Sequence, residues 1–137
     1  MAMLLDACPS FEPQWQDFLN EYQADDIYRA PANHIPYYIA LADLACHLIG
    51  MLERGETACF PTIFAVVERL HLEGDSYVQT AATVGLLEDL QNTYFYSLTR
   101  PEQFRPFFGA ETAYWWDRLY RFWEHGELLT DQRGGAG

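Results

Sequence analysis

Apolar residues recur every three to four positions along most of the chain, and a glycine or proline stands where many of these runs begin or end. This spacing places apolar side chains on one face of an α-helix, and Pro and Gly are typical of helix starts and ends. No alternating run with a hairpin turn competes with it. The spacing predicts helices over 10–23, 36–54, 61–73, 76–92 and 111–125, with a short helix after a Thr99–Glu102 capping box.

The connections at Gly55 and Gly74-Asp75 are short, so consecutive helices must turn back on one another as antiparallel pairs. The expected helix 76–92 is apolar on two sides and contains Ala81, Ala82 and Gly85, which let neighbouring helices approach closely. This pairing resembles a HEAT-type helical repeat. We therefore expect an all-α fold, a compact single-domain bundle of about six to seven helices with HEAT-like antiparallel pairs at its centre. Residues 1–130 would form the domain and 131–137 a flexible tail.

Length and cysteine usage bound the class of protein. The 137 residues fit one ordinary domain. No stretch approaches the ~20 apolar residues of a membrane span, and the first seven residues lack the features of an export signal. Cys8, Cys46 and Cys59 show no CxxC spacing, which is typical of free thiols in a reducing compartment. We expect a cytoplasmic protein.

The charge is strongly acidic. Asp and Glu number 20 against 8 basic residues, all of them Arg, for a formal net charge of −12. Nothing supplies the positive charge that nucleic acid or an anionic membrane requires, so neither is an expected partner. The acidic surface serves either solubility or the steering of a basic protein.

Three expected helices end in carboxylates, at Glu53, Glu73 and the pair Glu88-Asp89. The helix dipole places partial negative charge at these ends, so anions there are unfavourable. One explanation is internal neutralisation by arginines such as Arg69 and Arg100. The other is that the acidic ends bind a cationic partner, since positions that break a local rule are often functional.

The last expected helix has two aromatic stripes. Trp115, Leu119 and Phe122 form one, and the second comprises Trp116, Tyr120 and Trp123. Most of these side chains should be core, but so wide an apolar face leaves room for an interface, where aromatic residues commonly anchor a partner.

Catalytic patterns are absent from the sequence. Its histidines have no chelating spacing, and it lacks HExxH, G-x-S-x-G and a phosphate-binding glycine loop. We expect no catalytic residue, metal or cofactor, although a site assembled from distant residues stays open.

The segment 36–92 carries a recognisable pattern. Its marks are Leu41-Ala42-Asp43-Leu44, the segment 60–70 beginning Phe60-Pro61, Glu73-Gly74-Asp75 and the segment 85–92. It resembles a group of small, largely uncharacterised bacterial proteins, some of which resemble immunity proteins of polymorphic toxin systems. The resemblance implies a helical fold and a protein partner, and it assigns no contact residue.

These observations favour a non-enzymatic immunity protein that neutralises a cationic toxin domain by direct binding. A homo-oligomeric scaffold or adaptor is the alternative, and a small hydrolase or metal enzyme comes third. In the first hypothesis the carboxylates at 73, 75, 88 and 89 form one patch, and aromatic residues anchor the partner. The candidate partner-binding residues are Asp25, Asp26, Glu73, Asp75, Glu88, Asp89, Trp116, Tyr120 and Trp123.

Overall fold

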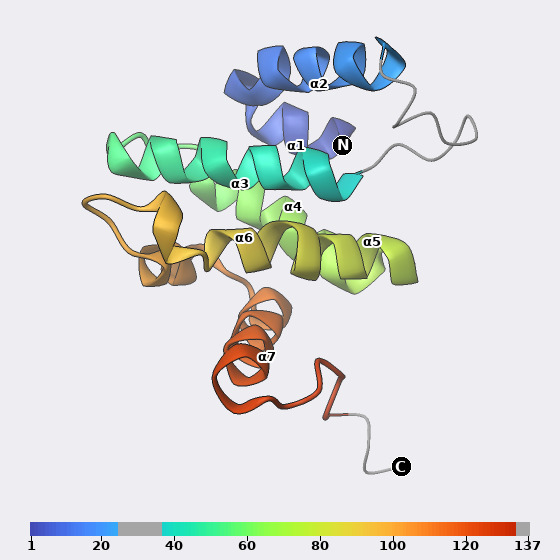
Figure 1. The fold of residues 1–137 in the computed structure, drawn as a ribbon, viewed down its shortest axis with the longest axis vertical. Coiled ribbons are helices and arrows are strands. Elements are labelled where there is room, and N and C mark those ends of the chain that lie inside the picture. The colour runs from blue at the N-terminus through green and yellow to red at the C-terminus, as the bar shows by residue number, and fades with distance from the viewer. Residues whose placement is uncertain (25–36, 134–137) are drawn as a thin grey trace.

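Helices supply all the regular secondary structure of the described residues, 1–24 and 37–133, in a computed structural model of the chain (Figure 1). The prediction of an all-α bundle is therefore confirmed. The elements are α1 (Ala2–Ala7), η1 (Pro9–Phe11), α2 (Glu12–Ala24), α3 (Tyr37–Glu53), α4 (Phe60–Glu73), α5 (Ser76–Thr80), the π-helical η3 (Ala81–Leu87), α6 (Glu88–Leu90), η4 (Thr93–Phe95), η5 (Pro101–Phe107) and α7 (Ala110–His125).

The centre of the molecule consists of α3, α4 and the helix that runs from α5 through η3 to α6. Figure 1 shows α1 and α2 on one side of this centre and α7 on the other. Gly55 has a φ of +74° and begins the connection from α3 to α4, as predicted. At the next connection Asp75 caps α5 by accepting a hydrogen bond from the Val78 N–H. Helix α4 contacts α5 and η3, as expected for consecutive helices that turn back on one another. Helix α3 instead packs beside the helix from α5 to α6 and runs in the same direction, with Tyr38 next to Tyr77 and Leu41 next to Gly85 (Figure 1). The likeness to HEAT repeats stays a prediction.

The helix from α5 to α6 is packed on more than one side. Residues Ala81, Ala82, Leu86 and Leu87 are all buried. At Gly85, a side-chain carbon would lie only 3.4 Å from Leu41, so the two helices approach as closely as the small residues predicted. This close packing fixes the position of the carboxylates that follow at the end of the helix.

An aromatic cluster joins the end of the chain to this centre. The rings of Phe60 and Phe104 lie 5.3 Å apart, those of Phe64 and Phe108 lie 5.2 Å apart, and Phe108 is 5.0 Å from Trp116. Through these rings, η5 and α7 pack on α4. This packing places α7 beside the end of α6, where Gln91 contacts Trp116.

Local details differ from the sequence-based expectations. Helix α1 was not predicted, since six residues are too few for a helical period to be visible. The capping box that precedes η5 consists of Arg100 and Gln103, not of Thr99 and Glu102 as expected. In it, the Arg100 N–H donates to Gln103 Oε1 at 2.7 Å. Asn92 does not close the helix in a left-handed conformation; it caps η4 by accepting from the Tyr94 N–H.

Two further expectations concern the ends of the chain and the membrane. The described part of the predicted tail, 131–133, lies against α7, since Arg133 pairs with Glu111 and its guanidinium stacks 3.7 Å above the Tyr114 ring. Residues 134–137 lie outside the described part.

Within 1–24 and 37–133, none of the helices combines the length and the apolar character needed to cross a bilayer.

Candidate partner-binding surface

A hollow of about 470 Å³ opens between the end of α6, the loop that contains η4, and α7. It brings together residues from segments about 30 positions apart. We call it the acidic hollow and define it by Glu88, Asp89, Tyr94, Tyr120, Trp123 and Glu124. Four of these, Glu88, Asp89, Tyr120 and Trp123, were singled out from the sequence.

The carboxylates of Glu88 and Asp89 form no ion pair with any residue in 1–24 or 37–133, because the arginine ion pairs seen there all go to other carboxylates. Burial raises the pKa of both groups, and the charge of Asp89 raises that of Glu88 further. Two partly buried carboxylates thus lie next to each other, and no arginine of the described ranges pairs with them.

The other acidic helix ends are satisfied within the molecule. Glu53 accepts hydrogen bonds from the backbone N–H groups of Ser97 and Leu98, which lowers its pKa. Glu73 forms an ion pair with Arg69 at 2.7 Å. Neutralisation by an arginine therefore holds at the end of α4, whereas backbone N–H groups take that role at the end of α3. Among the described residues, the end of α6 has neither kind of compensation.

Aromatic side chains line the hollow beside its carboxylates. Trp123 is 61% exposed and Tyr94 is 95% exposed, whereas Trp116 is 1% exposed and belongs to the core. The Tyr120 hydroxyl donates to Glu102 Oε1 at 3.3 Å, and burial together with Glu102 raises the pKa of Tyr120. Large flat rings at the surface next to unpaired carboxylates are suited to a cationic side chain, which interacts with both.

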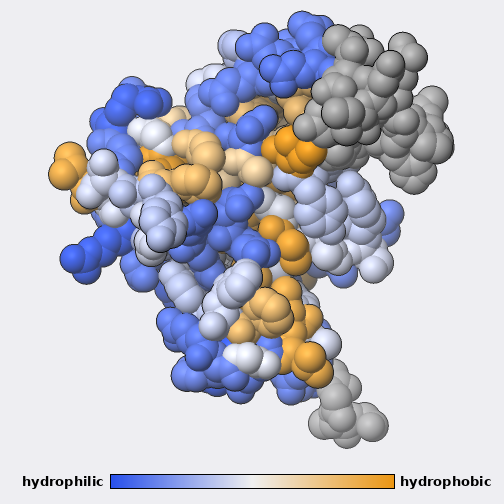
Figure 2. Space-filling view, in the orientation of Figure 1, coloured by the Kyte–Doolittle hydropathy of each residue, from blue (hydrophilic) through white to orange (hydrophobic). Residues whose placement is uncertain are grey.

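Further apolar residues lie on the loop after α6. Phe95 is 43% exposed and Leu98 is 91% exposed. Figure 2 shows a largely hydrophilic face with hydrophobic residues projecting at its left edge, where Figure 1 places this loop. Phe95 directly follows Tyr94 of the acidic hollow, so its exposed ring adds apolar area beside that residue.

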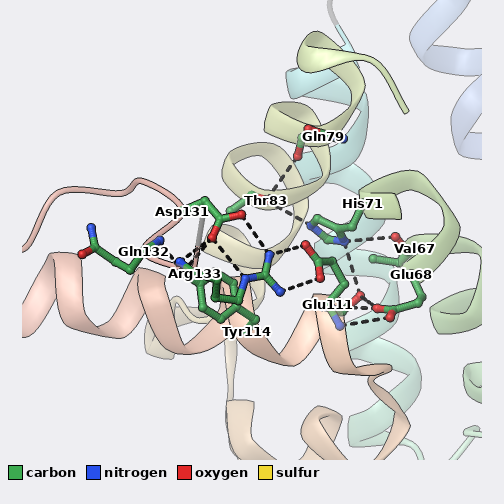
Figure 3. Close-up of polar contacts among 11 residues, drawn as sticks. Val67, Glu68, His71, Gln79, Thr83, Glu111, Tyr114, Asp131, Gln132 and Arg133 are labelled. Carbon is green, nitrogen blue, oxygen red and sulfur yellow. Dashed lines mark hydrogen bonds and ion pairs between the residues drawn. The ribbon is translucent and has the colours of Figure 1, made fainter. Parts of the chain in front are cut away.

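The α7 wall of the hollow is held in place by a cap from a distant helix. Glu68 of α4 accepts hydrogen bonds from the N–H groups of Glu111 and Thr112 at 3.0 and 2.7 Å, and from the Thr112 hydroxyl at 2.8 Å (Figure 3). Burial alone would raise the pKa of Glu68, but these donors hold it below its ordinary value. A carboxylate at a helix N-terminus satisfies free N–H groups and opposes the helix dipole.

His71 extends this network into the π-helical segment. Its Nδ1 lies 3.0 Å from the Val67 carbonyl oxygen and its Nε2 lies 3.0 Å from Thr83 Oγ1 (Figure 3). Burial lowers the pKa of His71. Its Nδ1–H donates to the Val67 carbonyl oxygen, and its Nε2 contacts the Thr83 hydroxyl, which donates to the Gln79 carbonyl oxygen at 3.2 Å. The contacts of Glu68 and His71 lock α4, η3 and α7 together.

A direct hydrogen bond joins the two walls of the hollow. Gln91, the residue after α6, donates from Nε2 to the Trp116 carbonyl oxygen at 2.8 Å. Because both walls are tied to the core and to each other, the hollow is formed before any partner arrives.

The remaining predicted residues do not join this surface. Glu73 and Asp75 lie at the opposite end of the helix that ends in α6, about 20 Å away at 1.5 Å per residue, so the expected single patch is wrong. Trp116 is buried and unavailable as an anchor. Asp25 and Asp26 lie outside the described residues.

Two residues of the hollow were missed. Tyr94 follows the helix in a loop without periodicity, and Glu124 lies beside Trp123 in the last turn of α7. Only the acidic character of that last turn could have indicated Glu124.

No metal-binding group of three or more His, Cys, Asp or Glu side chains occurs in the part of the chain that the structure describes. Among the histidines there, His47 bonds Ser10 at 2.8 Å and Gln14 at 2.9 Å, and His71 bonds within the core. Both ring nitrogens of His47 and of His71 therefore contact other protein groups.

Comparison with known proteins places most of the chain in one family. Residues 1–124 match the family described as "Domain of unknown function (DUF7674)". No curated protein and no solved structure shows significant similarity to the chain.

Proposed function

The chain belongs to the DUF7674 family, and from that premise we propose that it is a non-enzymatic immunity protein that neutralises a cationic bacterial toxin domain by direct binding in the cytoplasm. The observation that carries the proposal is the acidic hollow. There, Glu88 and Asp89 stay unpaired among the described residues and partly buried, next to the exposed ring of Trp123.

The chemistry of the hollow supports an arginine side chain as its ligand. An arginine side chain of the partner would bond the carboxylates through its planar guanidinium and stack on Trp123 or Tyr94. The net charge of −12 would speed the approach of a basic domain, and the desolvated aromatic contacts would slow its release.

The wider surface supports a protein partner over a small molecule. The loop after α6, which supplies Tyr94 to the hollow, also exposes Phe95 and Leu98. Such a mixture of aromatic anchors and charges is typical of interfaces between proteins.

The test uses two variants with the same change in charge. Glu88→Gln with Asp89→Asn removes the unpaired carboxylates of the hollow, and Asp6→Asn with Asp17→Asn removes two exposed carboxylates elsewhere. Tagged wild-type protein is purified from its native bacterium at low and high salt, and any basic partner is expressed alone and together with each variant.

We expect one basic partner, released as salt rises, that inhibits growth when expressed alone and is neutralised by the wild type and the control. The hollow variant should associate about 10-fold more slowly at low salt. A partner that is harmless alone, or one that binds the hollow variant as fast as the wild type, would exclude the proposal.

Self-association is the second candidate function. Phe122 and Trp123, neighbours near the end of α7, are both exposed and would suit a symmetric interface. A mass in solution that grows with protein concentration would favour this scaffold role, and a constant monomer mass would exclude it.

A further inference from the structure

Three sulfur-containing residues line one hollow at the junction of α1, α3 and α4, and this cluster shares no residue with the acidic hollow. Cys8 directly follows α1, Met51 belongs to the last turns of α3, and Cys59 directly precedes α4. Cys8 Sγ lies 4.0 Å from Met51 Sδ, and Cys59 lines the same hollow as these two residues. All three cysteines of the chain are free.

We propose that Cys8, Cys59 and Met51 bind one Cu(I) ion through two thiolates and one thioether. Thiolate and thioether sulfurs are soft ligands, and Cu(I) is the common biological ion that prefers them. Metal–sulfur bonds of about 2.3 Å place the corners of a trigonal set about 4.0 Å apart. The distance between Cys8 Sγ and Met51 Sδ, 4.0 Å, already has this value.

The surroundings of the cluster favour Cu(I) over Zn(II). Structural zinc takes four ligands, commonly including imidazole nitrogen. The neighbouring histidine, His47, uses its two ring nitrogens to contact Ser10 and Gln14, so it is not free to act as a fourth ligand. A set of three sulfurs fits an ion that accepts low coordination numbers.

The ion has a route to the cluster. A hollow of about 550 Å³ is lined by Cys8, Met51 and Cys59 together with the Gly55–Ala58 connection. Cys8 is 1% exposed, whereas Cys59 is only partly buried and is the more accessible of the two thiols. An arriving ion would therefore meet Cys59 first and then Met51 and Cys8.

The ligands are held by regular backbone structure. The Cys8 N–H donates to the Leu4 carbonyl oxygen at 2.9 Å, and the Cys59 carbonyl oxygen accepts from the Ile63 N–H at 2.9 Å. Binding forms two sulfur–copper bonds to thiolates and one to the thioether, and it releases two thiol protons to solvent. Copper and sulfur keep their oxidation states.

The experiment titrates the reduced full-length chain with Cu(I) under anaerobic conditions, in competition with the coloured Cu(I) chelator bicinchoninate. Variants are Cys59→Ser, Met51→Leu, which keeps the side-chain volume, and the control Cys46→Ser, whose thiol lies outside the cluster. Far-UV circular dichroism checks that each variant keeps its helices.

We expect the wild type and Cys46→Ser to take one equivalent of Cu(I) with the same affinity. Cys59→Ser should bind more than about 100-fold more weakly, beyond the loss typical of a group that only supports a ligand, and Met51→Leu about 10-fold more weakly. The Glu88→Gln, Asp89→Asn variant should bind Cu(I) normally, which separates this site from the partner surface.

Failure of the reduced wild type to remove Cu(I) from the chelator would overturn the proposal, as would unchanged binding by folded Cys59→Ser. A Cys8–Cys59 disulfide in protein isolated without reductant, combined with no uptake by the reduced chain, would assign the pair to thiol–disulfide chemistry instead.

Discussion

Burial raises the pKa of both Glu88 and Asp89, and the charge of Asp89 raises that of Glu88 further. Their neighbours at the ends of α3 and α4, Glu53 and Glu73, are compensated by backbone N–H groups and by Arg69. A residue that lowers stability where its equivalents do not is a candidate for selection by function.

The first prediction follows from the raised pKa values of these two carboxylates. The native state holds their protons more tightly than the unfolded chain does. Their contribution to the free energy of unfolding therefore falls as pH rises from the ordinary carboxyl pKa values through the raised values of the folded state. Glu88→Gln with Asp89→Asn should therefore raise the free energy of unfolding at pH 7 by about 0.5 kcal/mol. Urea unfolding measures this difference.

The gain should disappear once the pH falls below the ordinary carboxyl values of 3.8 and 4.5, where both states are protonated. The control Asp6→Asn with Asp17→Asn should leave stability unchanged at both pH values. A loss of stability in the hollow variant at pH 7 would show that the carboxylates have a favourable contact inside the protein.

Among the elements, α7 depends most visibly on a residue outside itself. Its first turn has no side-chain cap of its own, because Gly109 stands at the N-cap position. The carboxylate of Glu68 replaces that cap from α4, and a side-chain carbon at Gly109 would clash with it. The glycine therefore gives the distant carboxylate room to reach the helix end.

The second prediction concerns this cap. Glu68→Gln removes the charge and one accepting oxygen, so the free energy of unfolding should fall by about 1 to 2 kcal/mol, with faster amide exchange in the first turn of α7. Since the pKa of Glu68 is lowered by folding, its stabilisation is full above pH 4.5 and is lost as pH falls through the folded value.

Glu56→Gln is the matched control, because Glu56 forms only an exposed ion pair with Arg54. It should change stability by a few tenths of a kcal/mol, about 0.3 kcal/mol at most. Equal effects of the two variants, or unchanged exchange in α7, would contradict the role given to Glu68.

For the whole molecule, the net charge of −12 repels itself in the folded state more than in the expanded unfolded chain. The third prediction is that raising the ionic strength from about 0.05 M to about 0.5 M increases the melting temperature. The expected rise is about 2 to 4 °C, equivalent to about 1 kcal/mol. Calorimetry at both ionic strengths measures it.

Repeating the measurement near the pH of zero net charge provides the control, because screening has little net repulsion to remove there. A salt effect of the same size at that pH would assign the stabilisation to apolar burial, which salts also strengthen.

The amino-acid sequence determined the helical class and most of the elements, because helix period, caps and breakers act between residues a few positions apart. The left-handed glycines Gly55 and Gly126 and the cap at Asp75 lie where local chemistry requires them. The small residues of 76–92 likewise indicated close packing on two sides, since their effect depends on size alone.

Only the tertiary structure decided which candidate residues form a surface. Trp116 and Trp123 belong to one sequence stripe, yet one is 1% and the other 61% exposed, because burial depends on neighbours from distant segments such as Phe108. Glu53 is satisfied by N–H groups 44 and 45 positions away, a pairing that no local pattern contains. Whether a charge stays unpaired is set by such long-range contacts, so the acidic hollow emerged only when α6, its loop and α7 were packed together.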